Sequence, residues 1–254
     1  MDSKERQKEI VDYINVINKV FINELILKYN KSEQTIRNDL RFLETQGLLQ
    51  RIHGGAIKKE QLSENPYKNR ILKNNKTKEL IGKVASKLIE TNDVIFLDSG
   101  TSILALVENF PENKKFKVIT SALHIANEAN KFENIEVHII GGILNSNLKE
   151  IYGSKTISEI SNFNANKAFL SISGFDIKKG LTENHILSAE VKKAMLKTAQ
   201  QIIVLADSSK EGKVNFETVA TFDEVDIFIT DNRISQEFRD DLSIYNTELV
   251  IANE

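Results

Sequence analysis

The sequence predicts a two-domain protein of the α/β class, in which a small helical module precedes a larger, doubly wound domain. Three observations lead to this prediction: apolar residues with helical spacing before residue 48, a hairpin pattern around two adjacent glycines, and continuous apolar runs after residue 93. Apolar runs without alternation are typical of strands buried on both faces of a parallel sheet. A chain of 254 residues is long enough for two such units, each with its own core.

Apolar residues at intervals of three and four predict three short helices at the start of the chain. The residues with this spacing are Ile10, Ile14 and Ile17 in the first helix, Leu25 and Tyr29 in the second, and Ile36, Leu40 and Leu43 in the third. We expect Ser3 to cap the first helix, which ends near Asn18. Gly47 is expected to end the third helix in a left-handed conformation.

The next segment indicates a β-hairpin and then a domain boundary. Two short apolar runs flank His53-Gly54-Gly55, and glycines between such runs are typical of a chain reversal. Three helices and a hairpin together predict a winged helix-turn-helix at residues 1–60, with the hairpin as the wing. Residues 61–75 are polar, lack periodicity and contain Pro66, so we interpret them as a linker. The second domain is then expected at residues 76–254.

The second domain shows an alternating pattern of strands and helices. Continuous apolar runs predict strands at 94–98, 117–120, 137–140, 168–173, 202–207, 227–231 and 249–252. Amphipathic stretches predict helices at 80–89, 103–109, 123–132, 189–199 and 236–242. This rhythm favours a Rossmann-like domain with a mainly parallel sheet.

Composition excludes several classes of site and location. The chain has no cysteine, which excludes disulfides and thiolate chemistry and fits a reducing cytoplasm. No apolar run approaches the roughly 18 residues of a membrane span, and the charged N-terminus is not a targeting segment. His124, His138 and His185 lack a metal-ligand spacing. We therefore expect a cytoplasmic protein with neither a metal nor a cofactor, and no contact with a membrane.

Charge and helical geometry point to nucleic acid as the partner of the first module. The net charge is -2, but residues 31–59 hold six basic side chains against three acidic ones. On a helical wheel, the third helix presents Gln34, Arg37, Asn38 and Arg41 on the side opposite its apolar residues. Arg, Gln and Asn match guanine and adenine edges in the major groove, and Ser32 would cap the helix. The alternative is a solvated helix face with an i,i+4 arginine pair.

Two motifs at matching spacing carry a resemblance to a known family. SEQTIRNDLRFL (residues 32–43) and GLLQRIHGGA (residues 47–56) resemble the helix-turn-helix and wing of the DeoR family of sugar-metabolism regulators. The resemblance implies that operator DNA is bound by the recognition helix and by the wing. These expected DNA contacts are Ser32, Gln34, Thr35, Arg37, Asn38, Arg41, Arg51, His53 and Lys58. His53 is alternatively a turn residue whose ring satisfies the backbone.

The sequence departs from the family pattern at two positions of the module. Asn38 stands where the family has a second arginine, so one phosphate or base contact is in doubt. Phe21 replaces the serine or threonine that opens the second helix, which predicts a weaker cap.

The segment DSGTS follows a predicted strand and precedes a predicted helix. Backbone N–H groups and hydroxyls at such a turn suit an anion at a helix N-terminus. The expected contacts are Asp98, Ser99, Gly100, Thr101 and Ser102. The segment is neither a Walker motif nor the GxGxxG fingerprint. The alternative is a tight connection, since Gly, Ser and Asp are ordinary turn formers.

Other strand ends add polar groups at the edge where open α/β sheets bind ligands. GGILN, YGS, GFD, GLT, AEVKKAML and DSSK resemble segments of the DeoR sensor domain, which is of the sugar-phosphate-isomerase type. The resemblance implies a pocket wall at Gly141, Gly142, Gly174 and Thr182, and charged contacts from Glu190, Lys192, Asp207 and Lys210. Lys210 suits a phosphate best, because it follows a strand end as a point charge. For Glu190 and Lys192 the alternative is a solvated helix face.

Together these features predict a regulator and not an enzyme. The resemblance implies a repressor of a sugar catabolism operon that is controlled by a phosphorylated sugar. The alternative is a sugar-phosphate isomerase or hydrolase with a DNA-binding appendage, in which Asp98, Glu183, Glu190 or Asp207 would be the base. A single small module reads few base pairs, so we expect a homodimer or homotetramer assembled through the α/β domain.

Overall fold

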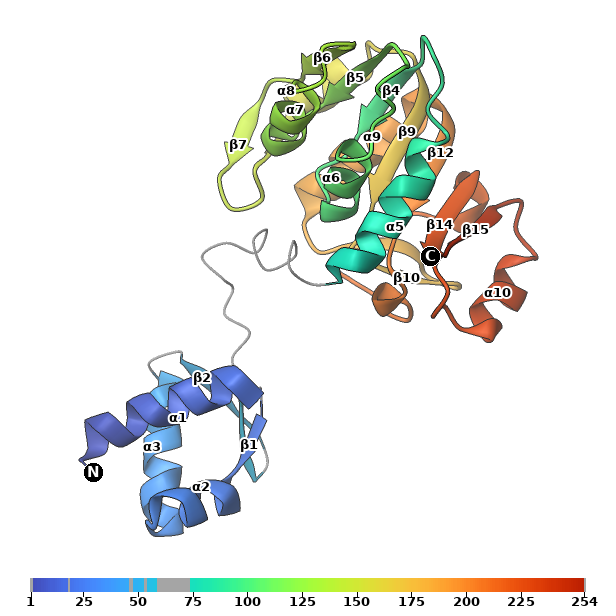
Figure 1. Ribbon diagram of the computed structural model, residues 1–254. Coiled ribbons are helices and arrows are strands. Elements are labelled where there is room, and N and C mark those ends of the chain that lie inside the picture. Colours follow the sequence, from blue (N-terminus) through green and yellow to red (C-terminus); the bar gives the residue numbers. More distant parts are fainter. Residues whose placement is uncertain (1, 18, 46–47, 53, 59–73, 254) are drawn as a thin grey trace. The chain divides into compact units, whose positions relative to one another are not determined.

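The computed structural model describes residues 2–17, 19–45, 48–52, 54–58 and 74–253. The chain divides into two compact units, residues 1–65 and 66–254 (Figure 1). The predicted linker at 61–75, Gly47 and His53 lie almost wholly outside the described residues. No helix in the described part of the chain has both the length and the apolar character needed to cross a membrane.

The three predicted helices are present in the N-terminal unit as α1 (Ser3–Ile17), α2 (Ile22–Tyr29) and α3 (Glu33–Thr45). Asp2 caps α1, because its carboxylate accepts a hydrogen bond from the Glu5 backbone N–H at 2.8 Å. The prediction that Ser3 is the cap is wrong. Ser3 is already helical, and its hydroxyl donates to the carboxylate of Asp39 instead.

A small antiparallel sheet completes this unit. The predicted hairpin is confirmed by two strands, β2 (Leu49–Ile52) and β3 (Gly55–Lys58). A third strand that the sequence did not predict, β1 (Lys19–Phe21), pairs with β3, so the strand order is β1-β3-β2. Phe21 then precedes α2 without a side-chain cap, and the Glu24 carboxylate accepts the Phe21 N–H at 2.9 Å.

The core of the N-terminal unit is apolar with one buried ion pair. The buried residues from the predicted helices are Ile10, Ile14, Leu25, Ile36, Leu40 and Leu43. Ile17 is 41% exposed, contrary to its predicted place in the stripe, because α1 ends there. Arg6 of α1 donates through Nε to Asp39 Oδ2 at 2.7 Å and through a terminal nitrogen to Oδ1 at 3.2 Å. Both side chains are buried, so this pair fixes α1 against α3.

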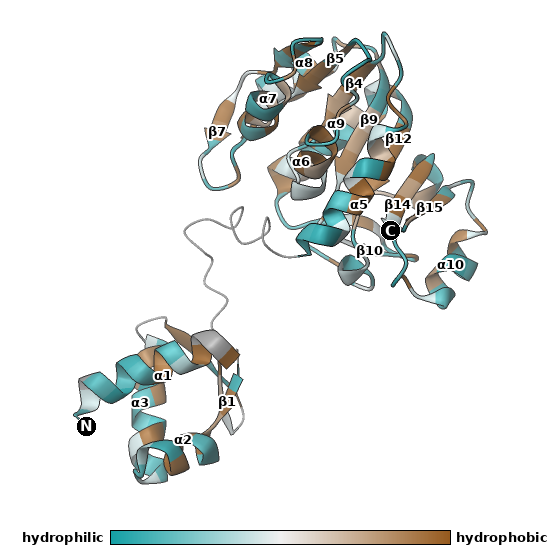
Figure 2. Ribbon diagram, viewed as in Figure 1, coloured by the Kyte–Doolittle hydropathy of each residue, from teal (hydrophilic) through white to brown (hydrophobic). Residues whose placement is uncertain are grey.

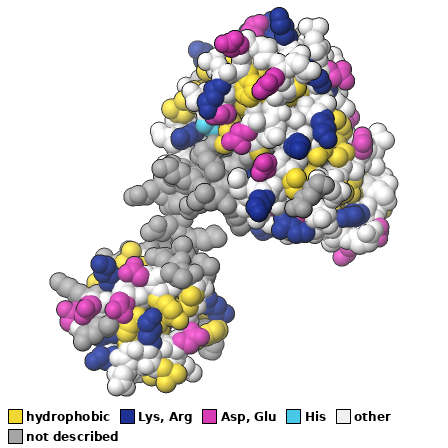
Figure 3. All heavy atoms as spheres, in the orientation of Figure 1, with side chains coloured by type: hydrophobic (Ala, Val, Ile, Leu, Met, Phe, Trp, Pro, Cys, Tyr) yellow, Lys and Arg dark blue, Asp and Glu magenta, His cyan; other side chains and the backbone are white. Residues whose placement is uncertain are grey.

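The surface of this unit also carries an apolar groove. Val11, Phe42, Leu43 and Leu48 supply its apolar wall, and Gln7, Lys8 and Asp12 complete it. Figure 3 shows hydrophobic side chains gathered on the visible face of this unit.

The second unit contains the predicted parallel sheet. Its seven strands are β4 (Val94–Leu97), β5 (Phe116–Thr120), β6 (Ile135–Ile139), β9 (Ala165–Ser171), β12 (Ala199–Leu205), β14 (Ile227–Asp231) and β15 (Glu248–Ala252). The order is β15-β14-β12-β9-β4-β5-β6, and all six pairings are parallel. Each strand lies where an apolar run predicted one.

Helices cover both faces of this sheet. Along β4, Ile95 and Leu97 pack on one face with α5 (Asn75–Ser86), α6 (Thr101–Val107) and α7 (Leu123–Ala129). Phe96 packs on the other face with α8 (Ser154–Ile160), α9 (Ile186–Thr198) and α10 (Gln236–Leu242). Figure 2 shows hydrophobic residues concentrated on the strands between these layers. Helix α8 was not predicted.

Short antiparallel elements surround the carboxyl edge of the sheet. They comprise the hairpin β7 (Ile143–Asn145) and β8 (Glu150–Tyr152), and a small sheet of β10 (Gly174–Asp176), β11 (Gly180–Glu183) and β13 (Glu217–Ala220). Two 3-10 turns, η1 (Ser208–Lys210) and η2 (Phe222–Glu224), follow β12 and β13. The short runs in these strands carry no strand signal in the sequence, and none of them was predicted.

Candidate functional site

Helix α3 has one packed face and one free face, as the wheel predicted. The Ser32 hydroxyl accepts the Thr35 backbone N–H at 3.3 Å, so Ser32 is the expected cap. Ser32, Gln34, Asn38 and Arg41 are exposed, whereas Thr35 and Arg37 are partly covered. The exposed side therefore combines amide and guanidinium groups in the pattern that suits base edges.

The polar side chains on this face contact one another. Arg37 forms a salt bridge with Glu33, at 2.6 Å, one turn earlier in the helix. Gln34 donates through its side-chain amide to the Asn38 side-chain oxygen at 3.2 Å. An exposed i,i+4 ion pair contributes only about 0.3–0.5 kcal/mol. A phosphate or a guanine edge can therefore displace Glu33 from Arg37 at small cost.

Arg51 is the predicted wing residue whose side chain the structure describes. The Arg51 backbone N–H donates to Glu44 Oε1 at 2.9 Å, and its guanidinium lies 3.7 Å from Glu44 Oε2. Arg51 of β2 thus faces the C-terminal turn of α3 in the unbound protein. Lys58 is the last residue of β3.

In the sensor unit, Asp98 at the start of the DSGTS loop forms a buried ion pair with Lys192. Asp98 follows β4, and both of its carboxylate oxygens lie 2.7 Å from Lys192 Nζ of α9. Ser171, at the end of β9, donates to Asp98 Oδ2 from its backbone N–H at 2.9 Å and from its hydroxyl at 2.6 Å. Burial alone would raise the pKa of Asp98, but Lys192 and these hydrogen bonds outweigh it and lower that pKa.

Lys192 is a buried cation shared by several carboxylates. Its ammonium also lies 3.6 Å from Glu183 Oε2, and its side chain is only 2% exposed. Burial would lower the pKa of Lys192, but Asp98, Glu183 and Glu150 raise it. The solvated-face alternative is therefore wrong for Lys192. Glu190 is partly exposed and pairs with Lys193, and its predicted contact with an effector stays a prediction.

A helical signal in the sequence marked Lys192 as buried. The residues Ser188, Lys192 and Met195 are spaced by four and three, so they share one face of α9, and all three are buried. Ala189 and Met195 lie three residues before and after Lys192 and are buried, and this apolar spacing is the signal for an inward-facing lysine.

The rest of the DSGTS loop is shaped by a close approach to β9. A Cβ atom on Gly100 would lie 1.9 Å from the Ser171 hydroxyl, so this position requires glycine. Ser99 and Thr101 are partly exposed. Ser102 is fully buried, and its hydroxyl has no hydrogen-bond partner among the described residues. This hydroxyl lies in the first turn of α6 and is not used by the described residues of the protein itself.

Two further polar residues near Asp98 were not predicted. Glu150, at the start of β8, is buried and accepts a hydrogen bond from the Ser188 hydroxyl at 2.7 Å. His124 of α7 lies close enough to Ser99 and Lys149 to interact with their backbones, and burial lowers its pKa to about 4. No sequence signal pointed to Glu150, because it lies in a polar stretch without periodicity.

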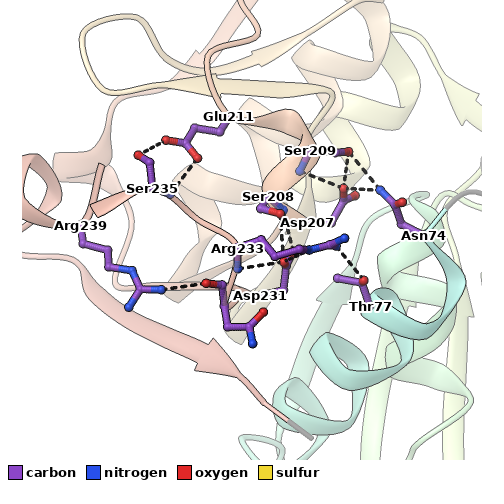
Figure 4. Close-up of polar contacts among 11 residues, drawn as sticks. Asn74, Thr77, Asp207, Ser208, Ser209, Glu211, Asp231, Arg233, Ser235 and Arg239 are labelled. Carbon is purple, nitrogen blue, oxygen red and sulfur yellow. Dashed lines mark hydrogen bonds and ion pairs between the residues drawn. The ribbon is translucent and has the colours of Figure 1, made fainter. Parts of the chain in front are cut away.

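Asp207 and Ser209, in the turn after β12, form a second polar group with Asn74 (Figure 4). Asp207 caps η1 by accepting the Ser209 backbone N–H at 3.2 Å, and it also accepts from Asn74. Burial would raise the pKa of Asp207, but Lys210 and these hydrogen bonds lower it. Asn74 precedes α5, whereas Lys192 lies on α9, so Asp207 and Asp98 face opposite sides of the sheet.

The predicted wall residues contribute mainly to packing. The Thr182 hydroxyl donates to the Gly174 carbonyl at 3.1 Å and accepts the Asn215 backbone N–H at 3.0 Å. A side chain on Gly174 would collide with the Lys213 carbonyl. The Gly141 carbonyl accepts the Thr156 hydroxyl at 2.9 Å, and a Cβ on Gly142 would strike that same hydroxyl. These four residues therefore position the loops around the edge.

Family models match both units. The model described as "DeoR-like helix-turn-helix domain" matches residues 6–61, and the model described as "DeoR C terminal sensor domain" matches residues 73–232. The second match alone spans more than half of the chain.

Relatives of full length agree with this assignment. The HTH-type transcriptional regulator GolR of Listeria innocua is 35% identical over 234 residues, 91% of this chain and 92% of the relative. The HTH-type transcriptional repressor GlcR of Bacillus subtilis is 31% identical over 255 residues, 100% of this chain and 98% of the relative. Ribose 5 phosphate isomerase A from Neisseria gonorrhoeae aligns with 53% of this chain and 52% of its own, with 12% identity and a TM-score of 0.40. The two family models and the two regulators show that the chain belongs to the DeoR family of transcriptional regulators, with a helix-turn-helix DNA-binding domain and a C-terminal sensor domain.

Proposed function

We propose that this protein represses genes of sugar catabolism and that a phosphorylated sugar, bound at the carboxyl edge of the parallel sheet, controls its affinity for operator DNA. The observation that carries the proposal is the buried Asp98–Lys192 pair beneath a loop of hydroxyl residues with an orphan Ser102 hydroxyl. The similarity to GlcR, which is named a repressor, supports the direction of control.

The proposed site offers hydrogen-bond donors for the phosphate and a hydrogen-bond acceptor for the sugar hydroxyls. The backbone N–H groups and hydroxyls of residues 99–102 suit the phosphate, because they are donors at the start of a helix. Lys210 adds a point charge from the turn after β12, two strands away from β4 in the sheet. Asp98 accepts hydrogen bonds and therefore suits sugar hydroxyls, while Lys192 neutralises its charge.

The test uses calorimetry with ribose 5-phosphate, glucose 6-phosphate and fructose 6-phosphate, each against its unphosphorylated sugar. Lys210→Ala should weaken the best phosphosugar at least about tenfold, because a charged hydrogen bond contributes about 1.5–3 kcal/mol. The unphosphorylated sugar should be affected far less. Lys213→Ala, an exposed lysine of the following loop, is the matched control. Equal affinities of wild type and Lys210→Ala would overturn this placement of the phosphate.

The same geometry supports catalysis less well than it supports ligand binding. A general base works best with a pKa near the working pH, but Lys192 and the hydrogen bonds from Ser171 lower the pKa of Asp98 and make it a weak base. Glu183 likewise accepts a hydrogen bond from the Ser173 hydroxyl. We therefore expect no turnover when phosphosugars are followed by NMR with the purified protein. Conversion of any of them would favour the isomerase or hydrolase alternative.

We also propose that the protein acts as at least a dimer, since symmetric regulators gain specificity by reading repeated half-sites. The sensor unit exposes large apolar side chains, including Phe216 at 75% and Ile143 at 68%. Light scattering should show a dimer or tetramer at micromolar concentration. A monomer that still binds the operator tightly would contradict this expectation.

A further inference from the structure

Glu150 is the most deeply buried carboxyl group that the proposed contacts leave unused. It is the first residue of β8, and it pairs with Ala122 just beyond the end of β5. Its side chain is 1% exposed, and Oε2 accepts a hydrogen bond from the Ser188 hydroxyl at 2.7 Å. Oε1 has no hydrogen-bond partner in the part of the chain that the structure describes. A buried carboxyl oxygen without a partner needs an explanation in terms of a ligand or a proton.

The charges around Glu150 are unbalanced. The titratable groups that interact with it are Asp98 after β4, Glu183 of β11 and Lys192 of α9. His124 of α7 interacts with Asp98 in the same region. Lys192 is the one cation of this set, and its ammonium already lies 2.7 Å from both oxygens of Asp98 and 3.6 Å from Glu183. His124 adds no charge near neutral pH, because burial lowers its pKa to about 4. A third ionised carboxylate would therefore lie in an anionic and poorly solvated place.

We propose that Glu150 is a neutral carboxylic acid whose Oε1 hydroxyl donates a hydrogen bond to an oxygen of the bound phosphosugar, which makes Glu150 a residue that determines effector specificity. This inference rests on the proposed function, because it assumes that the sugar occupies the Asp98 end of the sheet. Ser188 then holds the acid in place through Oε2.

The chemistry distinguishes a donor from an acceptor. An ionised Glu150 would accept from a sugar hydroxyl, as Asp98 does, but it would face two carboxylates that share a single ammonium. A protonated Glu150 avoids that repulsion and presents one unused O–H group. Its partner must then be an acceptor, such as a carbonyl, ring or hydroxyl oxygen of the sugar. A ligand that lacks an oxygen at this place would leave the acid unpaired and bind more weakly.

A protonated Glu150 predicts that the affinity for the sugar falls as the pH rises. Burial and the nearby Asp98 and Glu183 raise the pKa of Glu150, whereas Lys192 and Ser188 oppose the rise. Because the raised pKa belongs to the folded protein, the acid form is lost only as the pH rises through that value. Sugar affinity should therefore decline with rising pH in the wild type.

The experiment compares Glu150→Gln with Glu150→Ala in the full-length protein. Glutamine is neutral, accepts from Ser188 and keeps a donor, so Glu150→Gln should bind ribose 5-phosphate, glucose 6-phosphate or fructose 6-phosphate within about threefold of wild type and without the decline at high pH. Glu150→Ala should lose about tenfold or more, as expected for a lost buried hydrogen bond. Binding of inorganic phosphate should not change in either variant. Infrared difference spectra between wild type and Glu150→Gln should show a protonated carboxylic acid band without any ligand.

Each outcome decides between the two proposals. If wild type binds none of the three phosphosugars, the proposed function fails and this inference fails with it. If wild type binds a phosphosugar but Glu150→Gln loses as much affinity as Glu150→Ala, Glu150 is an ionised acceptor and this inference alone is overturned. Absence of the acid band in the wild type at neutral pH would also overturn it. An unchanged affinity in Glu150→Ala would show that Glu150 has only a structural role.

Discussion

The Asn74 side-chain amide donates to Asp207 Oδ1 at 2.8 Å and to the Ser209 hydroxyl at 3.1 Å. Asn74 has a left-handed backbone conformation, with φ of 56°, and lies directly before α5. Arg233 makes a parallel connection, because it donates to the Thr77 hydroxyl at 2.9 Å in the first turn of the same helix (Figure 4). The segment that carries Lys210 therefore holds the beginning of α5, the helix that follows the predicted linker.

Removing the Asn74 amide should loosen this end of α5. Asn74→Gly keeps the left-handed conformation at little cost and deletes only the hydrogen bonds, so we expect a loss of about 1 kcal/mol. Asn74→Asp should cost more, because it places a second carboxylate against Asp207. Urea unfolding gives the free energies, and hydrogen exchange should increase in the first turn of α5. Equal stability of the two variants would argue against a direct Asn74–Asp207 contact.

Lys192 and Lys193 offer a matched pair for testing the buried charges. Lys192→Ala should destabilise the protein by about 3–5 kcal/mol, because it leaves Asp98 and Glu183 without a cation. Lys193 is partly exposed and pairs with Glu190 and Glu217, so Lys193→Ala should cost less than about 1 kcal/mol. Thermal and urea unfolding measure both values. Similar losses for the two alanine variants would contradict the buried ion pair.

Acid should destabilise the sensor domain partly through Asp231. Burial would raise the pKa of Asp231, but hydrogen bonds from Arg233 and Ser208 lower it below its usual value. A carboxyl whose folded pKa is lowered stabilises the fold above its unfolded pKa, about 3.9. That contribution is lost as the pH falls through the lower, folded value. Asp231→Asn should therefore flatten the decline in unfolding free energy below about pH 4, whereas the exposed control Asp223→Asn should not.

The reading face of α3 predicts how DNA binding responds to substitution. Arg41→Ala or Arg37→Ala should each cost about 1–3 kcal/mol of specific binding, because bidentate base contacts have that value. Arg51→Ala in the wing should reduce the log-log salt slope by up to about one unit, as expected for a phosphate contact. Lys8→Ala on α1 removes the same charge outside the predicted reading face and serves as control. Gel shifts with wild-type affinity for the Arg37→Ala and Arg41→Ala double variant would refute the recognition face.

The sequence predicted the parallel sheet because burial on both faces leaves a plain signal. All seven strands overlap continuous apolar runs, and the helices α5, α6, α7, α9 and α10 overlap the predicted helices, although α5 begins at Asn75, five residues before its predicted start. The hairpin of β7 and β8 escaped prediction because its strands have three residues each, and Ile143 and Leu144 are exposed. A run that short gives no measurable alternation.

The candidate site was less predictable because it depends on contacts between distant residues. Asp98 was expected from its place at a strand end, but its partner Lys192 lies 94 positions later. The packing of α9 decides which of the adjacent lysines, Lys192 or Lys193, points inward. Glu150 is brought near Asp98 by the hairpin of β7 and β8, which was not predicted. The placement of Asp207 on the opposite face from Asp98 follows from strand alternation. Both residues closely follow a strand, so a position after a strand does not by itself separate them.

Different residues form the packed face and the exposed face of α3, so operator recognition can change without a change in the fold. Ile36, Asp39, Leu40 and Leu43 hold the helix in the domain, whereas Gln34, Asn38 and Arg41 are exposed and add nothing to the core. Exposed substitutions change folding free energy by only about 0.5 kcal/mol. After a gene duplication, one copy could therefore acquire a new set of target genes through a few surface changes, while the same folded scaffold is inherited intact.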